Sequence, residues 1–181
     1  MDLHLTAASP TDEEREAVDA LLGPPLPSSG DGDARVAYLD GRVVRGGREA
    51  RERRTLLLPA LHALQSRVGW ISEGGLNYVS SRLTVAPAEA YGVATFYAMF
   101  SVEPRPPVAL HVCDDLACRL AGSERLASHL EGAVGPERAT DAAATATWMR
   151  SPCLGMCELA PAVLVQAAGD GAADVAFGDA T

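Results

Sequence analysis

The sequence has few cysteines and no recognisable export signal. Only four of its 181 residues are cysteines. The N-terminus, from Met1 to Thr6, has neither the basic region nor the apolar region of a secretory signal. We therefore expect a protein that is not exported, whose thiols stay reduced and in which disulfides are disfavoured.

Long apolar runs and an excess of basic charge are also absent. The chain is 48% hydrophobic, but its apolar runs are interrupted well before the roughly eighteen residues that a membrane span requires. Its net charge of -9 and pI near 4.8 argue against nucleic acid as a partner, because phosphates require a basic face. We therefore expect neither direct membrane insertion nor nucleic-acid binding.

The motifs of common catalytic sites are missing too. The sequence has no phosphate-binding Gly-Lys-[Ser/Thr] loop, no Gly-x-Gly-x-x-Gly and no Cys-x-x-Cys, and its histidines are scattered without a Ser/His/Asp ordering. We therefore expect no independent active site. His111, two residues before Cys113, is predicted to be a strand residue with a satisfied ring rather than a metal ligand.

The four cysteines form two spaced pairs, Cys113-Asp-Asp-Leu-Ala-Cys118 and Cys153-Leu-Gly-Met-Cys157. Four thiolates are the ligand count of one metal centre. A structural zinc site accepts about two to four residues between paired ligands, and these pairs are loose for it. An iron–sulfur cluster spans further than a single ion and suits wider spacings. The spacing therefore favours a cluster, with zinc as the main alternative and disulfides as the weakest.

The second pair lies in a longer pattern. The stretch from Cys153 to Pro161, Cys-Leu-Gly-Met-Cys-Glu-Leu-Ala-Pro, resembles the cluster-binding signature of the thioredoxin-like [2Fe-2S] ferredoxin family, which includes the 24 kDa or E subunits of respiratory complex I. The separation of 35 between Cys118 and Cys153 is also similar to the family's pattern. Three further stretches agree with its helical N-terminal region: Leu58–His62, Gly69–Ser72 and Val93–Phe100. The resemblance runs from about Thr55 to Phe177.

The resemblance implies an α+β protein, with an N-terminal helical bundle followed by a thioredoxin-like α/β domain. We expect residues 1–54 to hold an N-terminal helix, a linker and an inserted hairpin, residues 55–104 the helical bundle, and residues 105–181 the thioredoxin-like [2Fe-2S] domain. The resemblance also implies one [2Fe-2S] cluster that transfers electrons, with four ligands: Cys113, Cys118, Cys153 and Cys157.

The family also implies partners. The chain is expected to be the electron-transfer subunit of an NADH:quinone oxidoreductase, docked on a flavoprotein subunit that binds FMN and NADH and assembled with the other subunits of the complex. FMN and NAD are expected on the partner, since no site for either is visible here. We expect a cytoplasmic protein, held at the inner face of the membrane only through its complex. The alternatives are the same module in an NAD-dependent formate dehydrogenase or hydrogenase, and a zinc-stabilised interaction module.

Local patterns predict the helices of the first half. A capping box at Thr11 and Glu14 opens a helix that runs to about Leu22. Residues 23–33 have the composition of a linker. The runs around Asp40-Gly41 that follow favour a hairpin turn, and the segment is expected to be a flexible insertion, with a partner-binding hairpin as the alternative. Five arginines between 45 and 54 indicate a charged helix face. Three helices should follow. The first has an apolar stripe from Leu57 to Val68, the second an N-cap at Ser72, and the third starts at Pro87. The third helix is expected to bury Phe96, Met99 and Phe100 at its end, in the bundle core or at a subunit interface.

The pattern changes to strands after Pro104–Pro107. Strands are expected over 108–112 and 144–149, with a helix capped by Ser123 between them and a hairpin formed by 162–166 and 174–177. Both cysteine pairs then follow strands, on adjacent loops. The resemblance also implies a last helix beyond the present C-terminus, so we expect either a naturally short chain or a partner over that face, and poor stability in isolation in both cases.

Charges near the cysteines bear on the expected cluster. Gly155 is predicted to turn the backbone tightly and to point amides at sulfur. Three acidic residues should hold the reduction potential low, and two arginines should offset them: Asp114, Asp115 and Glu158, with Arg119 and Arg150. The alternative for the two aspartates is that they merely face solvent. At these two positions the family more often has a small or neutral pair.

Overall fold

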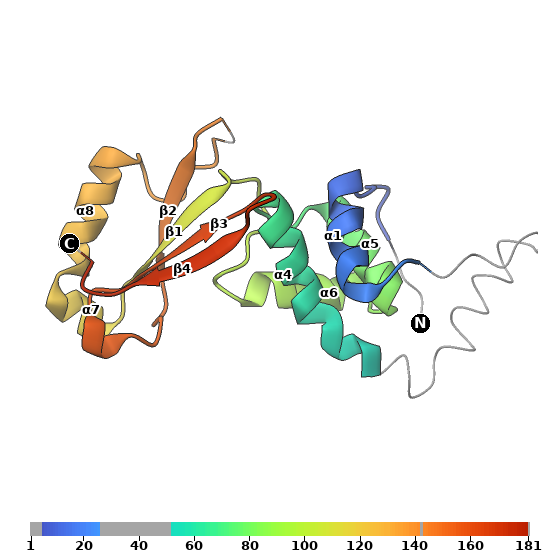
Figure 1. The fold of residues 1–181 in the computed structure, drawn as a ribbon, viewed down its shortest axis with the longest axis horizontal. Coiled ribbons are helices and arrows are strands. Elements are labelled where there is room, and N and C mark those ends of the chain that lie inside the picture. Colours follow the sequence, from blue (N-terminus) through green and yellow to red (C-terminus); the bar gives the residue numbers. More distant parts are fainter. Residues whose placement is uncertain (1–4, 26–51, 142, 181) are drawn as a thin grey trace, which may run out of the picture. The chain divides into compact units, whose positions relative to one another are not determined.

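The computed structural model describes residues 5–25, 52–141 and 143–180 (Figure 1). The chain forms two compact units: one contains the residues up to Leu64 together with Ser72–Phe96, and the other contains Gln65–Ile71 together with the residues from Tyr97 onward. The α+β class is confirmed, whereas the domain limits expected at 54/55 and 104/105 stay a prediction. The expected hairpin around Asp40-Gly41 and most of the expected linker lie outside the described residues.

The first unit is helical in its described part. Its elements are α1 (Asp12–Leu22), the short 3-10 turn η1 (Arg54–Leu56), the first part of α4 (Leu57–Val68), α5 (Glu73–Leu83) and α6 (Pro87–Phe96). The residues of α4 from Gln65 onward belong to the second unit. Helix α5 packs against both α1 and α6. No helix in the described parts of the chain has the length and apolar character needed to cross a bilayer.

The starts of α1 and α5 are joined by one buried carboxylate. The predicted capping box is confirmed: the Glu14 N–H donates to Thr11 Oγ1 (3.2 Å), and the Thr11 N–H donates to Glu14 Oε2 (2.7 Å). The Ser72 hydroxyl donates to the other oxygen of Glu14, and Ser72 also caps α5 by accepting from the Gly75 N–H (2.9 Å). Glu14 is thus buried with both of its oxygens satisfied.

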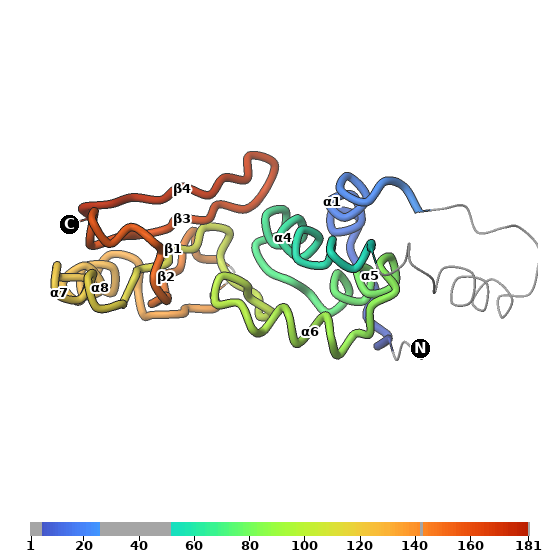
Figure 2. Tube along the Cα trace, turned by 90° about the horizontal axis from the view of Figure 1, so that it is seen from below, coloured from blue at the N-terminus to red at the C-terminus, as the bar shows by residue number. Residues whose placement is uncertain are grey.

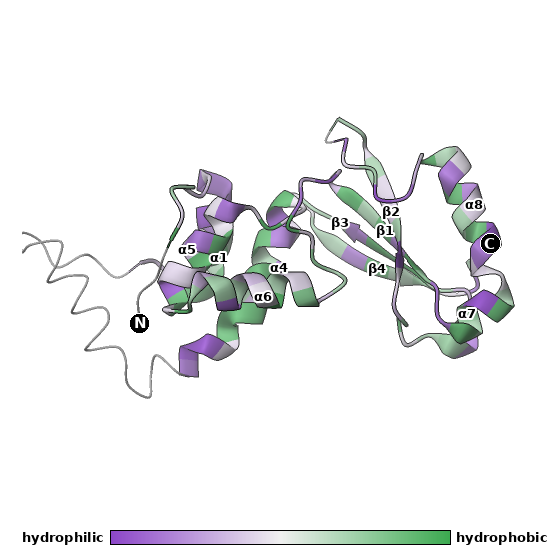
Figure 3. Ribbon diagram, turned by 180° about the vertical axis from the view of Figure 1, so that it is seen from behind, coloured by the Kyte–Doolittle hydropathy of each residue, from purple (hydrophilic) through white to green (hydrophobic). Residues whose placement is uncertain are grey.

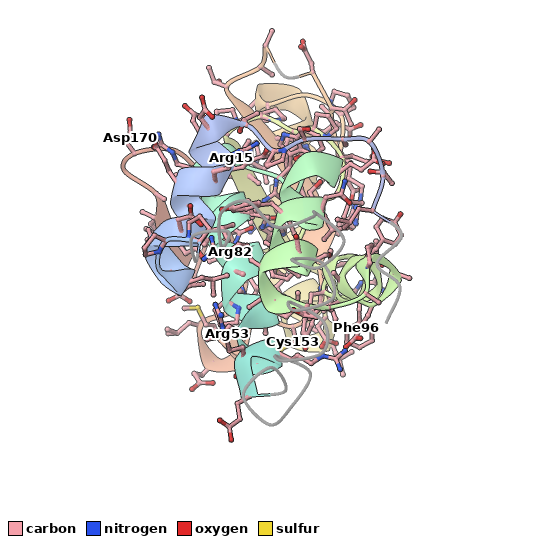
Figure 4. The ribbon with its side chains drawn as sticks, turned by 90° about the vertical axis from the view of Figure 1, so that its right-hand side faces the viewer. Arg15, Arg53, Arg82, Phe96, Cys153 and Asp170 are labelled. Atoms are coloured by element: carbon pink, nitrogen blue, oxygen red, sulfur yellow. The ribbon has the colours of Figure 1, made fainter. Side chains whose placement is uncertain are left out.

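A second tie between these two helices lies near their C-terminal ends. The Arg82 guanidinium of α5, labelled in Figure 4, forms an ion pair with Asp19 of α1. The apolar stripes of the helices lie in the core as predicted, except that Val68 is only half-buried. The core side chains of the unit include Val18, Leu57, Leu61, Leu64, Leu76, Val79, Leu83, Ala90 and Ala94.

One burial prediction for α6 was wrong. Phe100 is buried, and Met99 is half-buried, but Phe96 is 80% exposed. The inward face of α6 is set by Ala90 and Ala94, one turn apart, and a residue two positions after Ala94 points to the other side of a helix. The aromatic ring of Phe96 therefore lies on the outer face of the helix.

The second unit contains a mixed sheet. In the described residues it has four strands, in the order β2-β1-β3-β4, with β1 parallel to β2 and antiparallel to β3 (Figure 2). Strands β3 and β4 form the predicted hairpin. The bounds of the elements are β1 (Val108–Cys113), α7 (Leu116–Ala121), α8 (Ser123–Ala133), β2 (Ala146–Ser151), β3 (Val163–Ala167) and β4 (Ala173–Phe177).

Helix α8 packs on one face of this sheet. Its Ala127 is buried against Val112 of β1, Trp148 of β2 and Val163 of β3, with Leu126 and Leu130 beside it. The Trp148 indole N–H donates to the Gly135 carbonyl (2.8 Å), which satisfies the polar atom of a buried ring. Apolar and polar residues alternate along α8, as Figure 3 shows, because one side of the helix faces this core.

The opposite face of the sheet carries a buried polar set centred on Gln166. Its Oε1 accepts from His111 Nε2 (2.8 Å) and from Arg105 Nη2 (3.3 Å), and Arg105 Nε donates to the Gly69 carbonyl (2.7 Å). Burial lowers the pKa of His111 to about 4, so the ring is neutral at pH 7. His111 is a strand residue as predicted, but its ring is satisfied only at Nε2, since Nδ1 has no partner among the described residues.

The start of α8 differs from the prediction. Gly122, with φ at 104°, ends α7 and also occupies the N-cap of α8, whereas the Ser123 hydroxyl is buried without a partner in the described residues. The helix over 116–121 was not predicted from the sequence. Because one glycine in the left-handed conformation separates two helices, the serine after it falls inside α8 instead of capping it.

Candidate metal centre

The two cysteine pairs occupy two loops at the same end of the sheet. Cys113 is the last residue of β1 and Cys118 lies in α7, and both are buried, at 1% and 2% exposure. Cys153 follows β2, and Cys157 opens the 3-10 turn η2 (Cys157–Leu159); both are exposed. The prediction that each pair begins at the end of a strand is confirmed.

The two loops pack against each other. Cys113, Cys118 and Ala162 form one buried apolar group, and three residues of the second loop pack on it: Leu154, Met156 and Ala160. The Cys113 N–H also donates to the Ala162 carbonyl (3.0 Å), which ties the end of β1 to the residue before β3. The adjacency of the loops predicted from the sequence is therefore confirmed.

All four thiols are free, and the second pair is close. The Sγ atoms of Cys153 and Cys157 are 3.7 Å apart, well beyond the roughly 2.05 Å of a disulfide bond. Between them, Gly155 adopts φ of 78°, and its N–H donates to Cys153 Sγ (3.4 Å). The predicted tight turn, with an amide aimed at sulfur, is confirmed.

The thiols of the two loops interact electrostatically. Burial raises the pKa of the Cys118 thiol, and the neighbouring Cys113 and Cys157 raise it further. The hydrogen bond to Cys153 is the main reason that the pKa of Cys157 is raised. The raised pKa values keep these two thiols protonated, and a bound metal would favour their thiolate forms.

The donor set consists of four thiols from two loops, one pair buried and the other exposed. Four thiolates are the ligands of a [2Fe-2S] cluster. Within the ranges that the structure describes, no three side chains of His, Cys, Asp or Glu are arranged around a single ion position. The number and kind of the donors therefore fit a [2Fe-2S] cluster.

Asp114 is held by two arginines beside the first pair. Its carboxylate accepts two bonds from Arg119, at 2.9 and 2.8 Å, and lies 3.7 Å from an Arg150 nitrogen. The hydrogen bond from Arg119 is the main reason that the pKa of Asp114 is lowered. The predicted compensation of acidic charge by Arg119 and Arg150 is thus confirmed for Asp114, and the alternative that it merely faces solvent is wrong.

Asp115 caps the helix that follows the first cysteine. It is the N-cap of α7, where its carboxylate accepts from the Leu116 N–H (2.8 Å). This cap starts the helix that carries Cys118. Asp115 is exposed, so the alternative that it faces solvent holds for its carboxylate apart from this cap. An Asp placed three residues before Cys118 was the available signal for a short helix.

The ion-pair partners of Arg150 were not predicted from the sequence. Its guanidinium makes two bonds to Glu124 of α8, at 2.9 and 3.0 Å, and lies 3.6 Å from Glu137. Its backbone N–H also donates to Glu137 (3.0 Å). These partners are more than ten residues away in the sequence, so no local pattern indicated them. Together they tie the strand that leads into Cys153 to α8 and to the segment that follows it.

Comparisons with known proteins agree with this site. A family model described as thioredoxin-like [2Fe-2S] ferredoxin matches residues 46–174. The chain is 38% identical over 117 residues to the E 2 subunit of an NADH-quinone oxidoreductase from Rhizobium meliloti, a match that covers 63% of this chain and 68% of the relative. It is 32% identical over 115 residues to NADH-quinone oxidoreductase subunit 2 of Thermus thermophilus, covering 62% of this chain and 63% of the relative.

A solved structure is also similar. It is an NAD+-reducing [NiFe]-hydrogenase in the air-oxidized state, with a TM-score of 0.52 and 26% identity, and the match covers 66% of this chain and 22% of that chain. The similar region is therefore one part of a much longer hydrogenase polypeptide. The family model matches well over half of the residues of this chain, and the four free thiols converge from two adjacent loops. The chain therefore belongs to the thioredoxin-like [2Fe-2S] ferredoxin family.

Proposed function

We propose that the chain is the electron-transfer subunit of an NADH:quinone oxidoreductase, carrying one [2Fe-2S] cluster on Cys113, Cys118, Cys153 and Cys157. The observation that carries the proposal is the packing of the two cysteine loops against each other, with four free thiols between them. The relatives named as subunits of NADH-quinone oxidoreductase support the assignment to a multi-subunit oxidoreductase.

The chain's own residues hold and insulate the cofactor. An iron–sulfur cluster supplies one-electron transfer, in which no bond to a substrate is made. Cys113 and Cys118 are buried, so they and Ala162 exclude water on the inner side. Cys153 and Cys157 are exposed, so the outer side of the site is open to a partner. The Gly155 amide, aimed at Cys153 sulfur, favours extra negative charge there.

The partner in this proposal is a flavoprotein subunit that binds FMN and NADH, within a larger complex. Our chain then relays electrons without an active site of its own. It is placed in the cytoplasm, at the inner face of the membrane through that complex.

A second candidate is the same role in a hydrogenase. The similarity to the NAD+-reducing [NiFe]-hydrogenase favours it specifically. Purification of the native complex through a tag on this chain separates the two candidates. NADH-dependent quinone reduction supports the first, and hydrogen-dependent NAD+ reduction supports the second.

The experiment that tests the cofactor is EPR of anaerobically purified full-length chain, before and after dithionite, with iron and zinc analysis of the same sample. We expect a signal only after reduction, with about two irons per chain. Stoichiometric zinc without a signal would remove electron transfer and leave the zinc-stabilised interaction module. Iron with the EPR signal of another cluster type would contradict the [2Fe-2S] assignment.

Asp114→Asn is expected to raise the midpoint potential of the cluster by tens of millivolts, an order of magnitude given by Coulomb's law for one charge near a partly buried site. The substitution removes one negative charge and takes from Arg119 its ion-pair partner beside Cys113, whereas Arg150 keeps Glu124 and Glu137. A redox titration followed by EPR measures the change.

Asp115→Asn is the matched control for this prediction. It also removes one charge from the same loop, but asparagine keeps the N-cap of α7. Because Asp115 is exposed, solvent screens its charge and the shift should be smaller. An Asp114→Asn potential that stays the same or falls would show that this carboxylate does not tune the cluster.

A further inference from the structure

The second unit buries a guanidinium whose hydrogen-bond acceptors are both neutral. Arg105, in the segment before β1, is 9% exposed. Its Nε donates to the Gly69 carbonyl and its Nη2 to the Gln166 side chain, while Nη1 is buried without a hydrogen-bond partner in the described residues. Burial lowers the pKa of Arg105 to about 10, so the group keeps its charge at pH 7. A buried charge without a carboxylate partner is costly and is therefore a candidate for a functional role.

The amide of Gln166 connects this charge to β1. Its Oε1 accepts from Arg105 Nη2 (3.3 Å) and from His111 Nε2 (2.8 Å), so one oxygen atom separates the guanidinium from the imidazole. The imidazole is neutral at pH 7, because burial lowers its pKa to about 4. The amide of Gln65, which is also buried, lies 3.5 Å from the same oxygen. Arg105 is therefore the charged member of this polar set.

The polar set lies on the same face of the sheet as the first cysteine. Side chains alternate along a strand, and Val112, between His111 and Cys113, packs on the α8 side. His111 and Cys113 thus share the opposite face, and Ala162, which packs with Cys113, lies on that face of β3. Two residues of a strand span about 6.6 Å, so the guanidinium is on the order of 10 Å from the Cys113 sulfur. His111 and Cys113 are 0% and 1% exposed, so little water screens a charge on this side.

The charges on the other side of the first cysteine are paired. Asp114 forms an ion pair with Arg119, and Arg150 forms one with Glu124. The fields of two opposite charges in contact largely cancel at a distance, whereas a single buried charge is felt further away because the interior screens it less. The chain as a whole has a net charge of -9, which opposes the addition of an electron. Arg105 favours the more negative state of a centre bound to Cys113.

We propose that Arg105 raises the reduction potential of the centre held by Cys113, as a buried counter-charge on the inner side of the site, and that Gln166 positions it as a neutral partner. This inference rests on the proposed function, because it requires a redox-active cluster on the four cysteines. Reduction adds one electron and makes the site more negative by one charge. The guanidinium stabilises that state without a proton or a ligand moving. A neutral residue at position 166 suits this role, since a carboxylate there would cancel the charge of Arg105.

The test is a redox titration of the cluster-loaded full-length chain, followed by EPR at pH 8, where His111 is neutral. Arg105→Met removes the charge and keeps a long unbranched side chain. We expect the equilibrium constant for reduction to fall at least about threefold, measured as a lower midpoint potential. Gln166→Met is the matched control, because it removes the neutral partner of the same hydrogen bond and keeps the charge. Its equilibrium constant should stay within about 1.5-fold of wild type.

A second variant, Gln166→Glu, keeps the test decisive if Arg105→Met does not fold. It changes the size of the side chain little and places a carboxylate on Arg105, so it should also lower the equilibrium constant at least about threefold. An unchanged potential in a folded Arg105→Met or Gln166→Glu chain would overturn the proposal. An equal fall in Gln166→Met would overturn it too, since the hydrogen-bonded structure, and not the charge, would then set the potential. Wild-type chain without an EPR signal after dithionite would instead refute the proposed function.

Discussion

Gly74→Ala is expected to destabilise the helical unit by about 2–4 kcal/mol, the cost of forcing a side chain into backbone. A Cβ at Gly74 would lie 2.2 Å from the Ser9 carbonyl oxygen and 2.5 Å from its carbon. The segment before α1 cannot simply move away, because the Asn77 side chain holds it through Thr6 Oγ1 (2.7 Å) and the Ala8 carbonyl (2.9 Å). Urea unfolding followed by far-UV circular dichroism measures the change.

Gly92→Ala is the control for this prediction. The same substitution in the next helix meets no atom, so it should stabilise the chain by about 0.5–1 kcal/mol. The two glycine changes are therefore expected to have opposite signs. If Gly74→Ala proved as stable as wild type, the close approach of the N-terminal segment to α5 would be wrong.

Cys118→Ser is expected to lose the cluster. The residue is buried beside Cys113, and a serine hydroxyl does not replace a thiolate as a ligand for this centre. We expect the iron content to fall from about two per chain toward zero and the EPR signal to disappear. Stability should fall as well, because a cofactor that binds only the folded chain stabilises it. Iron analysis, EPR and thermal unfolding of wild type and variant measure all three.

The same outcome is expected for serine at each of the other three cysteines. Leu120→Ser is the control, since Leu120 lies in the same helix as Cys118 and is 83% exposed. It should keep the full iron content. A cysteine variant that retains two irons and an unchanged EPR spectrum would remove that residue from the ligand set.

Prediction from the sequence worked best where the signal was local. The capping box at Thr11 and Glu14, the N-cap at Ser72 and the hairpin of β3 and β4 all depend on residues within a few positions of one another. The turn at Gly155 belongs to the same class. In each case the hydrogen bonds or the backbone conformation are formed within one short segment. The local structure therefore depends little on the rest of the fold.

Prediction failed at two residues for different reasons. The hydrophobicity of Phe96 suggested burial, but the inward face of α6 is formed by Ala90 and Ala94. Propensity describes a residue alone, whereas burial depends on what packs against it. Ser123 has the chemistry of an N-cap, but the adjacent Gly122 joins α7 to α8 and takes that position.

The sequence by itself determined the family, the α+β class, most helix and strand positions and the two cysteine pairs, because spacing and periodicity are written along the chain. Only the tertiary structure decided that Cys113 and Cys118 are buried while Cys153 and Cys157 are exposed, and that Arg150 joins Asp114 to Glu124. These arrangements require strands and helices far apart in sequence to meet. The burial of the cysteines and the contacts of Arg150 are therefore set by long-range packing, which no local sequence pattern encodes.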